Sequence, residues 1–85
     1  MEALSAYYLI VSKVRQDQNF IPRNYQSIGG MWSTDTWQLN EIKYNLTEGD
    51  DWIYHPNVHV WRDYSNNLHF KNGTEEDLIT LAKSL

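Results

Sequence analysis

Residues 58–71, with the sequence VHVWRDYSNNLHFK, decide the fold that we expect for this chain of 85 residues. Apolar and polar side chains alternate before and after the central SNN at 65–67, which is typical of two antiparallel strands joined by a short loop. With Asn67 in a left-handed conformation, a three-residue loop places Arg62 opposite Phe70. One face of this hairpin is then apolar and carries Val58, Val60, Tyr64, Leu68 and Phe70.

The same register pairs side chains on the other face of the hairpin. Asp63 then faces His69 as a charge-assisted pair, and Trp61 faces Lys71 as a cation–π pair. An aspartate also orients the general base of a catalytic triad, but no serine of this chain lies in a Gly-x-Ser-x-Gly motif. We therefore interpret both pairs as structural.

The residues after the hairpin predict a helix over 74–84, the only long helix that we expect. Thr74 and Asp77 approximate a capping box, and the acidic residues at 75–77 suit the positive end of a helix dipole. Leu78, Leu81 and Leu85 follow at the spacing of one apolar helix face.

Two segments before the hairpin predict further strands. Residues 51–54, DWIY, are β-prone, and TEGD at 47–50 is typical of a turn, so another hairpin is expected there. Residues 36–46 fit a strand with a bulge near Asn40 and Glu41, which unites five apolar side chains on one face. They also fit a helix, which splits the five, and we favour the strand.

The N-terminal segment allows two interpretations. Residues 6–14 are dense in β-branched and aromatic side chains and predict a strand, while a helix over residues 4–15 is the alternative. Residues 16–31 form a long connection with Pro22 as a breaker. Together these elements predict an α+β fold in one domain over residues 1–85: a small antiparallel meander sheet of four to five strands with one C-terminal helix packed on one face.

Composition narrows the classes of function. Seven Lys and Arg against eleven Asp and Glu give a net charge of −4, which argues against a protein that mainly grips phosphate backbones. The absence of cysteine excludes disulfides and thiolate metal sites. The longest apolar run, YYLIV at 7–11, is too short to span a membrane, and the N-terminus lacks signal-peptide features. We expect a cytoplasmic protein with no membrane partner.

No residue pattern predicts catalysis, a cofactor or a metal site. A proline follows His55 and disfavours a helical ligand pair there, while His59 and His69 fall on the solvent side of the hairpin without facing each other. Gly29 and Gly30 lack the neighbours that a phosphate loop requires. We therefore expect a protein that is not an enzyme.

Acidic residues surround a tryptophan at the predicted 47–50 turn, and this cluster is the predicted partner-binding site. It consists of Glu48, Asp50, Asp51 and Trp52. Carboxylates attract a basic surface, and a desolvated indole ring is a common energetic centre of interfaces. The sequence favours a protein-binding module, an inhibitor or immunity-type modulator of an enzyme with a basic, nucleic-acid-handling surface, as phage-encoded inhibitors are.

Two alternatives stay open. Basic and aromatic residues alternate in the N-terminal half, where they would bind single-stranded nucleic acid by stacking, although that half is neutral overall. These residues are Lys13, Arg15, Phe20, Arg23 and Tyr25. The second alternative is a small structural subunit that forms homo-oligomers.

Overall fold

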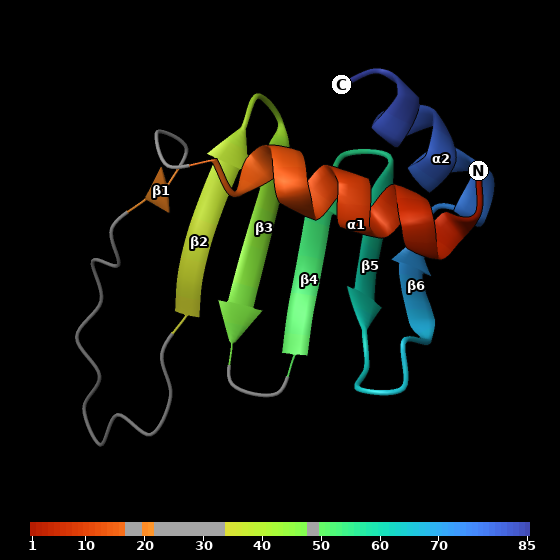
Figure 1. The fold of residues 1–85 in the computed structure, drawn as a ribbon, viewed down its shortest axis with the longest axis horizontal. Coiled ribbons are helices and arrows are strands. Elements are labelled where there is room, and N and C mark those ends of the chain that lie inside the picture. Colours follow the sequence, from red (N-terminus) through yellow and green to blue (C-terminus); the bar gives the residue numbers. More distant parts are fainter. Residues whose placement is uncertain (17–19, 22–33, 48–49) are drawn as a thin grey trace.

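Two helices pack on one side of a six-stranded antiparallel sheet (Figure 1). The computed structural model describes residues 1–16, 20–21, 34–47 and 50–85. The helices are α1 (Ala3–Val14) and α2 (Glu75–Lys83), and the strands are β1 (Phe20–Ile21), β2 (Thr34–Leu39), β3 (Ile42–Thr47), β4 (Asp50–His55), β5 (Val58–Arg62) and β6 (Leu68–Asn72). Neighbouring strands follow chain order, so the predicted α+β meander with a C-terminal helix is confirmed. The two-residue β1 and the N-terminal helix add to it.

Residues 6–14 belong to α1, so the prediction of a strand there is wrong, and α2 is not the only long helix. Ala6, Tyr7, Ile10 and Val14 are buried, whereas Tyr8 is exposed. This spacing is one apolar stripe of a helix. A strand would need partners on both faces, whereas the stripe buries its whole apolar side against the sheet. Tertiary packing therefore overrides the β-propensity of these side chains.

Residues 36–46 form strands, as predicted, but they form two strands instead of one bulged strand. β2 and β3 are joined at Asn40 and Glu41, and Leu39 pairs with Ile42 across this turn. Asn40 has a φ of 55°, a left-handed conformation that asparagine tolerates better than most residues. The five apolar side chains share one face, as expected, because they lie opposite each other across a hairpin.

The β5–β6 loop is longer than the predicted three residues and spans 63–67. Asn66, not Asn67, has the left-handed φ of 64°, and Arg62 pairs with Leu68 instead of Phe70. The Asp63 carboxylate accepts the backbone N–H groups of Ser65 and Asn67, which holds the wider loop. Tyr64 consequently leaves the apolar face and is 87% exposed in the loop.

The register of this hairpin changes with the loop. The wider loop pairs Trp61 with His69, so the predicted Trp61–Lys71 pair is wrong. A bulge between His59 and Val60 then shifts the pairing again, so that His59 pairs with Asn72. Asp63 does meet His69, as predicted, but it does so from the loop and not across the strands.

The capping box of α2 is present. Thr74 Oγ1 accepts the N–H of Asp77 at 3.2 Å, and the Asp77 carboxylate accepts the N–H of Thr74 at 2.9 Å. Gly73 precedes it with a φ of 84°, and a side chain there would collide with the Asn57 carbonyl. The chain therefore turns into α2 at a position that requires glycine.

The inner face of the sheet closes the core against both helices. Its buried residues are Ile42, Tyr44, Ile53, Val58 and Val60 from the sheet, with Ala6, Tyr7, Ile10 and Val14 from α1 and Leu78 and Ala82 from α2. α2 also packs directly against α1. Neither described helix is long and apolar enough to cross a membrane.

Candidate functional site

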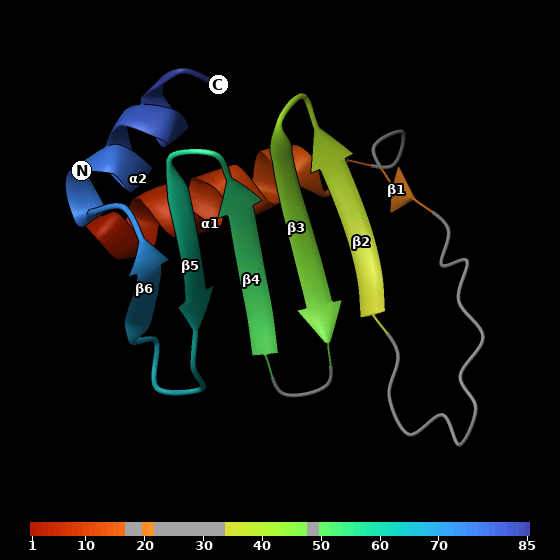
Figure 2. The same cartoon turned by 180° about the vertical axis from the view of Figure 1, so that it is seen from behind.

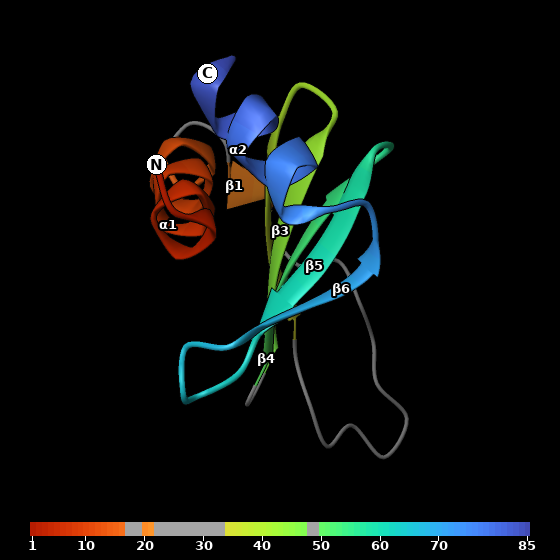
Figure 3. The same ribbon diagram turned by 90° about the vertical axis from the view of Figure 1, so that its right-hand side faces the viewer.

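The opposite side of the sheet, the outer face, has no covering helix in the described part of the chain (Figure 2). Both helices lie on the inner side (Figure 3). Because side chains alternate along a strand, those between the buried residues point outward. On β3 to β6 the outer face carries Lys43, Asn45, Trp52, Tyr54, His59, Trp61, His69 and Lys71. Most of these are aromatic or imidazole rings, which makes this face the candidate site.

Three of the rings form a row across β4, β5 and β6. Trp52 pairs with Trp61, and Trp61 pairs with His69. The two indole centroids are 5.6 Å apart, and Trp61 stacks on His69 at 4.3 Å with an interplanar angle of 16°. Such stacked pairs contribute about 0.5–1.5 kcal/mol beyond the area that they bury.

Two further rings join this row. The ring centroids of Tyr54 and His59 are 4.3 Å apart. The centroid of Trp52 lies 6.0 Å from that of Tyr54 and 5.0 Å from that of His59. We call these five residues, Trp52, Tyr54, His59, Trp61 and His69, the aromatic ladder. Trp52 is at its centre because it contacts three of the other members. The Trp52–Tyr54, Trp52–Trp61 and Trp61–His69 pairs are stacked, so these rings cover part of one another's faces, whereas His59 is tilted against Trp52 and Tyr54.

Hydrogen-bond donors surround the ladder. The Lys71 ammonium lies 5.6 Å from the centroid of Trp52, in a cation–π contact, and Lys43 is exposed beside Tyr54. The indole N–H groups of Trp52 and Trp61 have no hydrogen-bond partner in the described part of the chain, and neither is buried. The outer face therefore presents donors to whatever covers it.

His59 is a half-buried member of the ladder. Its Nε2 atom is buried and has no hydrogen-bond partner in the described part of the chain. Burial, and then the nearby Lys71 ammonium, lower the pKa of His59 below the ordinary 6.5. At neutral pH this imidazole is therefore an uncharged member of the ladder.

His69 ends the ladder and meets a carboxylate. Its Nε2 atom is 2.9 Å from Oδ2 of Asp63. The contact with His69, together with backbone N–H groups of the loop, lowers the pKa of Asp63 to about 2. The ladder is thus fixed at one end to the β5–β6 loop.

The four residues predicted to bind a partner do not share one surface. Trp52 lies on the outer face, whereas Asp51 is only 6% exposed and lies on the inner face, so these two residues do not belong to one contact surface. Asp50 pairs with Thr47, as the predicted hairpin requires, and Glu48 lies outside the described residues. Adjacent residues of a strand point to opposite faces, and this separates Asp51 from Trp52.

Asp51 is the centre of a buried polar cluster between α1 and the sheet. Tyr7 Oη donates to its backbone carbonyl at 2.8 Å and to Oδ2 at 3.2 Å. Tyr44 Oη and Arg62 Nε also donate to Oδ2, at 3.3 Å and 3.4 Å. Burial and the Asp51 carboxylate raise the pKa of both tyrosines, which keeps them protonated as donors. The cluster satisfies a buried charge and attaches α1 to β4.

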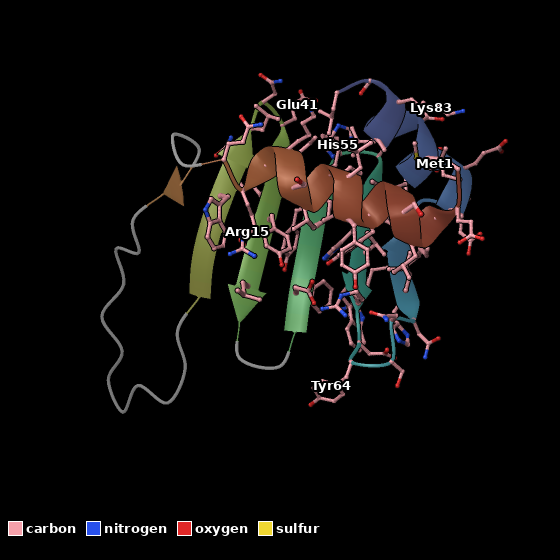
Figure 4. The ribbon with its side chains drawn as sticks, viewed as in Figure 1. Met1, Arg15, Glu41, His55, Tyr64 and Lys83 are labelled. Carbon is pink, nitrogen blue, oxygen red and sulfur yellow. The ribbon has the colours of Figure 1, made fainter. Side chains whose placement is uncertain are left out.

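Only part of the basic and aromatic set of the N-terminal half lies within the described residues. Lys13 is on α1 and Arg15 follows its last turn, where the guanidinium covers the ring of Trp37 at 4.7 Å on the helix side (Figure 4). Phe20 is in β1, and Arg23 and Tyr25 lie outside the described residues. The described members come from α1, the turn after it and the edge strand β1, where Phe20 pairs with Trp37.

The histidines do not gather into a metal site. Within the described ranges, no group of three or more His, Asp and Glu residues has metal-binding geometry. His55 accepts the Asn57 N–H at Nδ1, and its Nε2 lies 3.8 Å from Glu41 near the turns at the upper end of the sheet (Figure 4).

No protein-family model, curated protein or solved structure was found to match this chain.

Sequence reasoning identified Trp52 but missed the ladder around it. The sequence does contain the pattern that places these rings on one face. The residues that alternate with the inward-facing ones are Trp52 and Tyr54 on β4, His59 and Trp61 on β5, and His69 and Lys71 on β6. The pairing of β4 with β5 unites them on one face, and the alternation within residues 58–71 alone does not indicate that pairing.

Proposed function

We propose that this chain is a protein-binding module whose contact surface is the outer face, with Trp52 as its energetic centre. The observation that carries the proposal is a ladder of five rings on a sheet face that no described element covers. Two of the four tryptophans, Trp52 and Trp61, lie on this face, on the side of the sheet away from the core. Four of the ladder side chains are half-buried and His69 is exposed, and a contiguous patch of apolar surface that stays accessible is typical of an interaction surface.

The ladder has the properties of an interface centre. Tryptophan and tyrosine dominate such centres because they bury a large area and lose little conformational entropy. Here each ring is already held by its neighbours, so binding costs little further ordering. If the partner is an enzyme, covering its surface would inhibit it, which is the role favoured by the sequence.

Single-stranded nucleic acid is less well supported as the partner. Bases stack on exposed ring faces, whereas the ladder covers ring faces with other rings.

The test begins with a pull-down from the native host and identification of the retained material. Association and dissociation rates of the purified partner are then measured against the parent and Trp52→Ala. We expect Trp52→Ala mainly to accelerate dissociation and to cost about 2 kcal/mol, roughly thirtyfold in Kd.

Tyr64→Ala is the matched control, because Tyr64 is an exposed aromatic residue in the β5–β6 loop outside the ladder (Figure 4). We expect it to bind like the parent, with both variants folded by circular dichroism. Parent-like binding by Trp52→Ala would refute the proposal, as would retention of nucleic acid alone.

A further inference from the structure

The charged side chains described on the outer face are cations. Lys43 and Lys71 are both exposed there. Two carboxylates border the face, and each lies beside a histidine: Asp63 at 2.9 Å from His69, and Glu41 at 3.8 Å from His55. Two ammonium groups on the face thus stand against two carboxylates at its border, whereas the whole chain, from which the sequence predicts a basic partner, has a net charge of −4.

The hydrogen-bonding groups of the face are mainly donors as well. The two indole N–H groups and the two ammonium groups donate only, and the Asn45 side-chain oxygen already accepts a hydrogen bond from Thr36. A partner that covers these donors without supplying acceptors would leave them unsatisfied, at about 1–3 kcal/mol for each buried group. Carboxylates are the acceptors that form the strongest hydrogen bonds with such donors.

On the basis of the proposed function, we infer that the outer face binds an acidic segment of its protein partner, with carboxylates that meet Lys43, Lys71 and the indole N–H groups. Apolar side chains of the same segment cover the ladder between these charges. Phosphate groups would satisfy the same donors, but the stacked rings leave little ring face for bases. An acidic protein segment fits both the donors and the rings.

The sheet limits how far apart the carboxylates lie. Lys43 and Lys71 extend from β3 and β6, which are three strand spacings apart, or roughly 14 Å. Lys71 reaches back over Trp52 on β4, which shortens the span between the ammonium groups. An extended chain covers about 3.3 Å per residue, so the two acids should be separated by at most about four residues.

The test is selection of random peptides displayed on phage against three immobilised proteins: the parent, the Lys43→Ser/Lys71→Ser double variant and Trp52→Ala. We expect peptides from the parent to be enriched in Asp and Glu around an apolar centre. This acidic enrichment should disappear on the double variant. Enrichment of basic or uncharged peptides on the parent would overturn the inference.

Trp52→Ala separates this inference from the proposed function. If the parent and Trp52→Ala select the same peptides, the ladder is not the contact surface and both proposals fail. If the selections differ but the peptides on the parent are not acidic, only the inference about the partner fails.

A synthetic peptide of the selected consensus quantifies the effect. We expect the Lys43→Ser/Lys71→Ser variant to bind this peptide about tenfold more weakly than the parent does. We expect a similar loss when the parent binds an amide peptide, in which Asn and Gln replace the Asp and Glu of the consensus. The difference should shrink at high salt. Equal affinities for the acidic and amide peptides would contradict the inference, as would tighter binding of an oligothymidylate than of the peptide.

Discussion

Asp51 and Trp52 are adjacent in sequence and have opposite roles in the structure. The carboxylate of Asp51 is enclosed by Tyr7, Tyr44 and Arg62, while the indole of Trp52 is on the outer face. The sequence around them does not indicate that Asp51 is buried, because Tyr7, one of the three residues that enclose its carboxylate, lies 44 positions earlier. Local sequence cannot report a contact of that range, and for this reason the burial of Asp51 was not predicted.

Removal of one donor from the Asp51 cluster tests this arrangement. We expect Tyr7→Phe to lower the free energy of unfolding by about 1–2 kcal/mol, because a buried acceptor loses hydrogen bonds while the ring still fills the core. Tyr8→Phe is the control, since the Tyr8 hydroxyl donates to Asn66 at an exposed site. Urea denaturation measures both, and equal effects of the two substitutions would argue against a buried cluster.

Asp63 makes stability depend on pH in the acidic range. Its pKa is lowered from 3.8 to about 2 in the folded state, so its stabilising contribution is present above pH 3.8 and is lost as the pH falls through about 2. We expect the parent to be more stable than Asp63→Asn near pH 5, with the difference vanishing near pH 2. Denaturation curves across this range and NMR titration of the Asp63 carboxyl group check this. A carboxyl that titrates at 3.8 would contradict the contact with His69.

Among the elements, α2 could be predicted from its sequence and α1 could not. The capping box and the leucine spacing of α2 lie within a few residues of each other. α1 lacks a side-chain cap, and its tyrosine, isoleucine and valine residues suit a strand equally well. What decides in favour of a helix is the apolar face of a sheet that is formed by residues much later in the chain.

The capping box of α2 provides a test at this scale. We expect Thr74→Ala to lower the free energy of unfolding by about 1 kcal/mol, because the N–H of Asp77 loses its acceptor. Thr80→Ala is the control on the exposed side of the same helix, and it should change stability little. A similar loss in both variants would mean that the cap contributes no more than an average helix position.

For the whole molecule, the meander and the apolar inner face followed from alternation in the sequence, whereas the widened β5–β6 loop did not. The loop depends on hydrogen bonds of the Asp63 side chain that compete with strand pairing. The alternation of apolar and polar residues does not indicate such hydrogen bonds. The resulting shift moved His69 opposite Trp61 and thereby extended the ladder.

The two-faced sheet predicts different costs for neighbouring residues of β4. Ile53→Ala should lower the free energy of unfolding by about 2–5 kcal/mol, since Ile53 is fully buried in the core. Trp52→Ala should cost clearly less, because it removes only ring contacts on the outer face. Urea denaturation compares the two, and an equal or larger loss for Trp52→Ala would make the ladder a structural element.

The attachment of α1 to the sheet also has a consequence for biosynthesis. The helix leaves the ribosome before the strands, yet Asp51, the partner of Tyr7, is synthesised 44 residues later, and Asn66, the partner of Tyr8, 58 residues later. The strands, by contrast, pair with their nearest neighbours in the chain, so each hairpin can form soon after its synthesis. The apolar stripe of α1 is therefore without its final partners until most of the chain has been made. Nascent chains stalled before β4 would present Ile10 and Val14 to chaperones, or to each other.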